Sequence, residues 1–267
     1  MARTWDEIKR NIRLLDELLA EVGTDLKRVV QHYHDSDFYL RLLELEGVWT
    51  EKDELRLQEM TKGTRHHRDH RDVRTYVADL LLGWAVQDVV TELLLKAGYE
   101  CHSAGSNSGR QLLTGRQITE EPDLVLTAPN GETWWLDVVT DYPTKREALS
   151  YWIETKRCEL RDNKFKRLME KRVEGARVGL IGISVGAKSY FGLELTNELK
   201  RELENPPKLN RRIYRIETHW PFGGKPAIAL NLRLLGVQFH PFREFPKGLP
   251  FAEQISTPEK EGNDDAD

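Results

Sequence analysis

After Gly98 the sequence changes from helical periodicity to short apolar runs that alternate with helices, and this change constrains the fold most. The runs expected to form strands are 99–103, 124–128, 133–140, 178–185 and 228–237. Helices are expected between them, at about 145–173 and 190–203. Because strands that alternate with helices are typical of α/β domains, we predict a central mixed β-sheet flanked by helices.

The segment before this change is expected to be helical. Ile8, Ile12 and Leu15 recur at helical spacing ahead of Gly23, and a second such segment ends at Gly47. A long helix is expected from about residue 73 to residue 97. We therefore divide the chain into three parts, which are an N-terminal helical region (1–72), an α/β core (73–250) and an acidic tail that is expected to be disordered (251–267).

Composition narrows the class of protein. Hydrophobic residues make up 39% of the chain and charged residues 31%, which leaves enough apolar residues for a core. The formal net charge of −4 gives no global basic signal, so contacts with nucleic acid would have to come from local basic patches. Cys101 and Cys158 have no pairing pattern, and no apolar run approaches the ~20 residues of a membrane span. We expect a soluble protein of the reducing cytoplasm with no membrane partner.

Two acids occupy two neighbouring expected strands in "EPDLVLTAPNGETWWLDVVT", residues 121–140. Side chains alternate between the faces of a strand, so Trp135, Asp137 and Val139 share one face. An ionised Asp between large apolar neighbours is costly to bury unless it is paired or coordinates a metal. Asp137 is therefore a candidate functional residue, and Asp123 lies across the expected hairpin from it.

The length of the hairpin turn decides whether the two acids meet. A two-residue Asn-Gly turn would put Asp123 opposite Val138, with Asp137 on the other face. A three-residue turn at 129–131 would put Asp123 directly opposite Asp137, about 5 Å away. Two carboxylates at such a short distance repel each other unless a cation lies between them. Hard oxygen ligands such as carboxylates suit Mg²⁺. In the other register the two acids merely flank a turn.

Pro122-Asp123, a spacer and an acid on the next strand resemble the motif of the PD-(D/E)xK, or restriction-endonuclease-like, nucleases. The preceding helix fits as well, because it ends in Gly98-Tyr99 and leads into the first expected strand. That helix often carries a Glu of the metal site in the family, and Gln87 takes its place here. The resemblance covers about residues 73–185 and implies a restriction-endonuclease-like core.

The resemblance also implies a chemistry. It implies hydrolysis of DNA phosphodiester bonds with Mg²⁺, for which Mn²⁺ can substitute. Asp123, Asp137 and the backbone carbonyl of Val138 would hold the metal ion, and Gln87 would complete the catalytic site. Such an ion polarises the phosphate and lowers the pKa of a bound water.

One position departs from the family motif, which would place a lysine at residue 139. This sequence has Val139. Some relatives carry the lysine on a nearby element, and the candidates here are Lys145, Lys156 and, as a third choice, Lys164. Loss of activity is the alternative interpretation.

Two basic segments are candidates for contact with nucleic acid. The loop between the first two expected strands offers Ser106, Asn107, Arg110 and Arg116, which suit phosphate and guanine contacts. The expected helix 145–173 offers Arg157, Arg161 and Lys164 at steps of three and four. A solvated loop and a solvated helix face are the alternative interpretations.

The function that this pattern favours is a Mg²⁺-dependent endonuclease acting on double-stranded DNA. Its most natural setting is a type II restriction enzyme of a restriction-modification system, acting as a homodimer so that each strand meets one active site. A DNA repair or recombination nuclease, such as a junction resolvase, is a related alternative. Val139 and Gln87 favour a different one, a catalytically inactive nuclease fold that serves as a DNA-binding or assembly module. An unrelated α/β domain is the third alternative.

Overall fold

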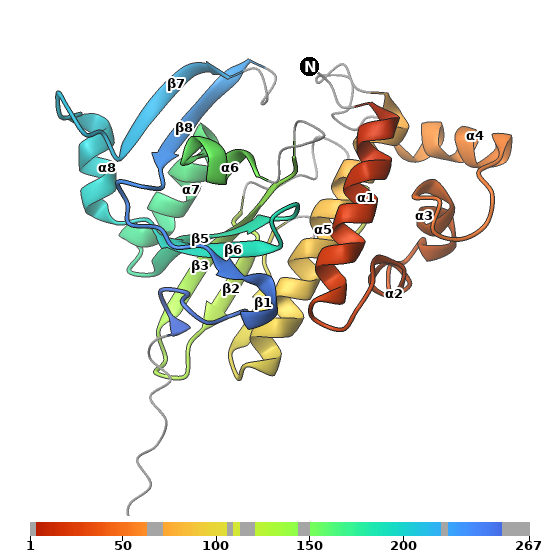
Figure 1. The fold of residues 1–267 in the computed structure, drawn as a ribbon, viewed down its shortest axis with the longest axis horizontal. Coiled ribbons are helices and arrows are strands. Elements are labelled where there is room, and N and C mark those ends of the chain that lie inside the picture. The colour runs from red at the N-terminus through yellow and green to blue at the C-terminus, as the bar shows by residue number, and fades with distance from the viewer. Residues whose placement is uncertain are drawn as a thin grey trace, which may run out of the picture.

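The computed structural model describes residues 4–62, 72–105, 109–112, 121–143, 150–219 and 224–252. Its architecture is α/β, and the predicted central mixed sheet is confirmed. In Figure 1, the helices within residues 5–60 lie on one side of this sheet, and the helices at residues 162–173 and 197–204 and a smaller sheet lie on the other. The predicted acidic tail lies outside the described residues from position 253 onward.

The central sheet has six strands in the order β1-β2-β3-β5-β6-β9. Their bounds are β1 (Glu100–Ser103), β2 (Leu124–Thr127), β3 (Thr133–Asp141), β5 (Arg177–Ser184), β6 (Ser189–Glu194) and β9 (His240–Pro241). β3 and β5 are parallel, and every other neighbouring pair is antiparallel. A parallel pair needs a crossover connection, and here that connection passes through α6 (Tyr151–Thr155), β4 (Arg157–Arg161) and α7 (Asp162–Val173).

The smaller sheet has the order β4-β8-β7. Its other strands are β7 (Ile213–His219) and β8 (Lys225–Asn231), and α8 (Asn197–Glu204) precedes them. A short 3₁₀ helix, Phe242–Glu244, follows β9. The inward side chains of this sheet, which include Leu160, Ile213 and Ile228, pack with α7 in a hydrophobic cluster of their own.

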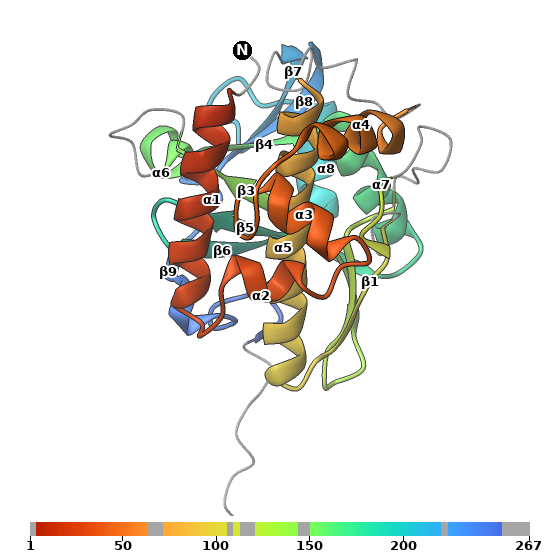
Figure 2. The ribbon, with the colours of Figure 1, turned by 90° about the vertical axis from the view of Figure 1, so that its right-hand side faces the viewer.

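The described residues before the first strand form the helices α1 (Trp5–Ala20), α2 (Leu26–Val30), α3 (Ser36–Leu42), α4 (Glu51–Met60) and α5 (Val73–Lys96). Figure 2 shows α1 and α5 running side by side, with α2–α4 in front of them. The predicted helix at 73–97 is confirmed in α5. Apolar residues of these helices and of the central sheet form one continuous core, so the N-terminal helices pack as part of the same body.

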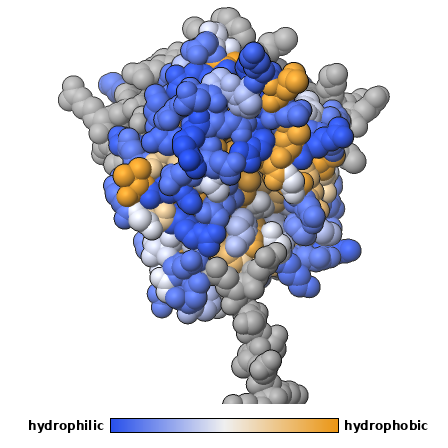
Figure 3. All heavy atoms as spheres, turned by 90° about the vertical axis from the view of Figure 1, so that its left-hand side faces the viewer, coloured by the Kyte–Doolittle hydropathy of each residue, from blue (hydrophilic) through white to orange (hydrophobic). Residues whose placement is uncertain are grey.

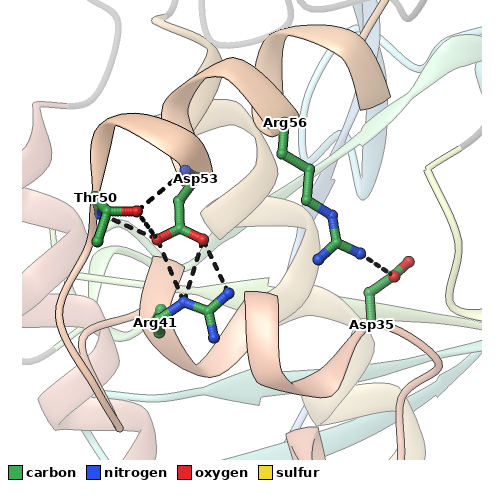
Figure 4. A network of polar contacts seen from close by, with 5 residues as sticks. All are labelled: Asp35, Arg41, Thr50, Asp53 and Arg56. Atoms are coloured by element: carbon green, nitrogen blue, oxygen red, sulfur yellow. Dashed lines mark hydrogen bonds and ion pairs between the residues drawn. The ribbon is translucent and has the colours of Figure 1, made fainter.

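Polar contacts hold α3 and α4 together at the periphery of this core. Arg41 donates hydrogen bonds from α3 to the carboxylate of Asp53, which also forms a capping box with Thr50 at the start of α4 (Figure 4). These bonds from Arg41 lower the pKa of Asp53 to about 2. A second ion pair joins Arg56 to Asp35 across 2.6 Å (Figure 4). Together they hold α3 against α4.

β3 is buried between two hydrophobic layers. Trp134, Leu136 and Val138 belong to the core that includes α5, whereas Trp135 and Val139 pack against the cluster that includes α7. The predicted alternation of faces along this strand is therefore confirmed. The face that carries Asp137 looks toward α7.

Two predicted helices are wrong in part. The expected helix 145–173 is interrupted, because Lys156 ends α6 with a φ of 55° and residues 157–161 form β4. Cys158 and Leu160 are buried and pair with Leu230 and Ile228 of β8, and this strand pairing overrides the local helical pattern.

The expected helix 190–203 begins only at Asn197. Its first half is β6, which pairs with β5 along its whole length and so gains a second side of backbone hydrogen bonds. The expected strand 228–237 is shifted toward the N-terminus and ends at Asn231. Among the described residues, no helix is both long and apolar enough to span a membrane.

Candidate active site

The β2–β3 hairpin has the three-residue turn. Thr127 pairs with Thr133, and the Ala128 N–H donates to the Glu132 carbonyl across 2.9 Å, which leaves residues 129–131 as the turn. Leu124 pairs with Leu136, so Asp123, one residue before β2, lies opposite Asp137. The register that brings the two acids together is the one that the protein adopts.

Backbone groups of each strand hold the acid of the other. The Asp123 N–H donates to Asp137 Oδ1 across 3.1 Å, and the Val138 N–H donates to Asp123 Oδ2 across 3.0 Å. The N–H and C=O of one strand residue point to the same edge. The Val138 carbonyl therefore faces the edge on which the Asp123 carboxylate lies, and it does so just beyond the end of β2.

Lys164 lies between the two carboxylates. Its Nζ is 3.4 and 3.3 Å from Asp123 Oδ1 and Oδ2 and 3.2 Å from Asp137 Oδ1. Lys164 belongs to the first turn of α7, whose buried residues Phe165 and Leu168 pack the helix over this face of β3. The third choice among the predicted lysines is thus the one that the fold brings to the acids.

Burial and neighbouring charge perturb the protonation of the group. Burial raises the pKa of Asp137 to about 6, Lys164 opposes the rise and Asp123 adds to it. For Lys164, burial lowers the pKa, but the charges of Asp123 and Asp137 prevail and raise it to about 12. Lys164 is therefore charged across the physiological range, and Asp137 exchanges its proton in weakly acidic solution.

One oxygen of Asp137 has no hydrogen-bond partner within the described part of the chain. The residue is fully buried, and no donor of the described residues bonds to its Oδ2. Buried polar atoms without a partner are uncommon and call for an explanation, such as an ion that binds there. Among the described residues, no group of three or more His, Cys, Asp and Glu side chains is placed to hold a metal. The donor set is therefore two carboxylates and one carbonyl, which suits Mg²⁺ because this ion completes its shell with water and phosphate oxygens.

Val139 is the residue where the predicted resemblance would place a lysine. Its side chain is partly buried and packs against the cluster of α7 and the small sheet. It lies on the same face of β3 as Asp137, two residues further along. The strand thus supplies an apolar contact at this position, and the ammonium group comes from the helix that packs on it.

In the described part of the chain, the side chain of Gln87 forms its hydrogen bond with Arg110 and not with the acids. Arg110 donates to the Gln87 amide oxygen across 3.1 Å and makes a two-pronged ion pair with Asp88. Arg110 is only 7% exposed. Within the described residues, no hydrogen bond joins Gln87 to Asp123 or Asp137. The guanidinium of Arg110 faces α5, so this conformation does not present it to a nucleic acid.

The other predicted residues are distributed as follows. Arg157 and Arg161 lie on β4, so the predicted helical stripe that joined them to Lys164 is wrong. Lys156 is an exposed residue at the end of α6, and among the described residues it makes no ion pair with the acids. Four predicted residues lie outside the described part of the chain, namely Ser106, Asn107, Arg116 and Lys145.

Two further groups on α7 and β4 were not predicted. Lys171, seven residues after Lys164 and so on the same side of α7, lies 4.5 Å from the centre of the Trp135 ring and 3.6 Å from Glu121. A buried acid on β4, Glu159, accepts a hydrogen bond from the Tyr151 hydroxyl across 3.0 Å and pairs with Arg157. The period of two in "RCELR" signals this strand, but its partners lie far along the chain.

Comparison with known proteins gives no match, because no family model, no curated protein and no solved structure is significantly similar to this chain.

Proposed function

We propose that this protein is a Mg²⁺-dependent nuclease that hydrolyses DNA phosphodiester bonds on a restriction-endonuclease-like core. The observation that carries the proposal is the contact of Lys164 with both Asp123 and Asp137. Two acids on adjacent strands and a lysine are the functional groups of the PD-(D/E)xK pattern. Here the lysine comes from α7, and this accounts for a valine at position 139.

Each residue has a role in the proposed reaction. Asp123, Asp137 and the Val138 carbonyl would hold the cation, and the unpartnered Oδ2 of Asp137 is a free donor atom for it. When bound, Mg²⁺ would polarise the scissile phosphate and lower the pKa of a water molecule. Lys164 would offset the negative charge that develops on the phosphate, in a site where burial strengthens electrostatic interactions.

We further propose double-stranded DNA as the substrate and a homodimer as the active species, so that each strand meets one pair of acids. A type II restriction enzyme of the cytoplasm is the setting that we favour. Both cysteines are free thiols, in keeping with a reducing compartment.

A cleavage assay with matched lysine variants tests the proposal. Purified protein is incubated with a mixed-sequence duplex DNA in Mg²⁺, in Mn²⁺ and in EDTA. We expect metal-dependent cleavage that Asp123→Asn abolishes and Lys164→Met reduces by at least about a hundredfold, the effect of removing one charge-stabilising donor. Lys156→Met is the control, because its side chain is exposed on the neighbouring α6, and it should cleave as the parent protein does.

The outcomes separate the alternatives. Discrete fragments indicate a sequence-specific enzyme, whereas a smear indicates a non-specific repair nuclease. A Lys164→Met variant that cleaves at the parent rate would contradict the role of this lysine. Intact DNA in every metal would contradict the nuclease.

A DNA-binding module without catalysis is the second candidate. The observation that favours it is that Lys164 already offsets one of the two negative charges of the acids, while Gln87, at the position of the additional acid, bonds to Arg110. Intact DNA that migrates more slowly with the protein in a native gel would support this candidate.

A further inference from the structure

The small sheet β4-β8-β7 has an outer face, which is turned away from the hydrophobic cluster that it shares with α7. Cys158 and Leu160 point from β4 into the core, so Arg157, Glu159 and Arg161 point outward. Residues that pair directly across neighbouring strands lie on the same face of the sheet. Glu159 pairs with Ala229, which in turn pairs with Tyr214, so these three side chains share the outer face. The outer face therefore has the small residues Ala227 and Ala229 along its middle strand, the polar residues of β4 on one side, and Tyr214 and Ile216 of β7 on the other.

Charge on this face is positive. Arg161 and Lys225 are exposed at the same end of the sheet, because Arg161 pairs with Ala227, two residues from Lys225 on β8, and Arg157 is partly exposed. The one acid of β4, Glu159, has a side chain that is only 7% exposed, and Arg157 neutralises it. The net charge of the whole chain is −4, so a positive face is a local feature and not the consequence of composition.

The guanidinium of Arg157 is held in place by tyrosine hydroxyl groups. Arg157 donates to the Tyr151 hydroxyl and, across 3.4 Å, to the Tyr214 hydroxyl, and it thus bridges from β4 to β7 over the buried Ala229. Tyr151 also bonds to Glu159. A guanidinium that is fixed in this way loses little conformational entropy when it binds a phosphate.

One end of the face is joined directly to the helix that carries Lys164. Arg161 is the last residue of β4, α7 begins at the next residue, and Lys164 lies in its first turn. From Arg157 to Arg161 the strand covers about 13 Å, which is the axial length of about four base pairs.

We propose that the outer face of β4-β8-β7 binds the phosphate backbone of a DNA duplex and leads it to Asp123 and Asp137. This proposal rests on the proposed nuclease function and names the surface on which its substrate is held. Figure 3 views the molecule from the side of β7 and α8, which is mostly hydrophilic, with hydrophobic residues confined to smaller areas. A polar, positively charged face suits a polyanion and not an apolar protein partner.

Binding of a fluorescein-labelled duplex, followed by anisotropy in EDTA over a range of salt concentrations, tests this surface without catalysis. The variants are Lys225→Gln alone and the pair Arg161→Gln with Lys225→Gln. The matched control is Lys200→Gln with Arg201→Gln, on α8. We expect the double variant to bind at least about tenfold more weakly and its salt slope to fall by about two, since each lost phosphate contact lowers the slope by about 0.9. The control should keep the affinity and slope of the parent.

Lys225→Gln protects the test against misfolding, because this residue is exposed at the first position of β8. It should lower the salt slope by about one. If both variants bind duplex as tightly as the parent while the parent cleaves DNA in Mg²⁺, the proposed surface is wrong and the nuclease stands. If the parent neither binds nor cleaves DNA, both proposals are wrong.

Discussion

Replacing Asp137 with Asn should make the protein more stable at alkaline pH, although it removes a proposed metal ligand. Asp137 is fully buried, and one of its carboxylate oxygens has no hydrogen bond. Asn keeps an oxygen that can accept the Asp123 N–H, and it carries no charge. The substitution therefore removes the cost of a buried negative charge and keeps the backbone contact.

The pKa of Asp137 sets the size and sign of this effect. Burial raises it from 3.8 to about 6 in the folded protein. A shift of about two units corresponds to about 3 kcal/mol. Because the folded state holds the proton more tightly than the unfolded state, the contribution of Asp137 to stability falls as the pH rises from about 4 to about 6. Above that window the whole cost is present, and so Asp137→Asn should gain roughly 1 to 3 kcal/mol at pH 8.

Urea unfolding of both proteins at several pH values measures this difference. The free energy of unfolding of the variant minus that of the parent should be positive at pH 8 and should shrink toward zero near pH 4, with unchanged m values. Titrations common to both proteins cancel in this difference. A variant that is less stable at pH 8, or a difference that does not change with pH, would refute the reasoning from burial.

Three further predictions use the same proteins. Mg²⁺ should raise the unfolding midpoint of the parent and of Asp141→Asn, a matched change on the same face of β3, but not that of Asp137→Asn; a free ion concentration a hundredfold above its dissociation constant adds about 2.7 kcal/mol, which thermal unfolding detects. In the Lys164→Met protein, Val139→Lys should restore part of the cleavage seen on gels, because position 139 shares a face with Asp137. Arg74→Met should lower the free energy of unfolding in urea by about 1 to 2 kcal/mol, because the Arg74 guanidinium lies 3.9 Å from the centre of the Trp5 ring.

The part of the site that is local in sequence could be predicted. The faces of β3 follow from alternation, and the two possible turn lengths left two registers for Asp123 and Asp137. The register itself depends on tertiary packing, because Trp134 and Leu136 must meet the core of α5 while Asp137 faces α7. The two acids could therefore be identified from the sequence, but the register that brings them together could not.

The part of the site that depends on distant pairing could not be predicted. Residues 157–161 lie between helical segments and carry charges that suit a helix, but their partners on β8 are about 70 residues away along the chain. Without that pairing the pattern reads as one long helix, and Arg157, Arg161 and Lys164 fall on one stripe. The break at Lys156, with its positive φ, turns Lys164 into a residue of the first turn of a new helix.

The position of Lys164 on α7 breaks a local rule, and this break is itself informative. The first turn of a helix carries partial positive charge and favours acidic side chains, so a lysine there is locally unfavourable. Two carboxylates within 3.4 Å offset this cost, and one of them is fully buried and itself destabilised by its charge. Asp137 and Lys164 are thus each locally unfavourable, and each is stabilised by the charge of the other. Local preferences give way in this manner at functional sites more often than in ordinary cores. An apolar Val139 and a lysine from the facing helix together place the positive charge over the acids, where the proposed phosphate would lie.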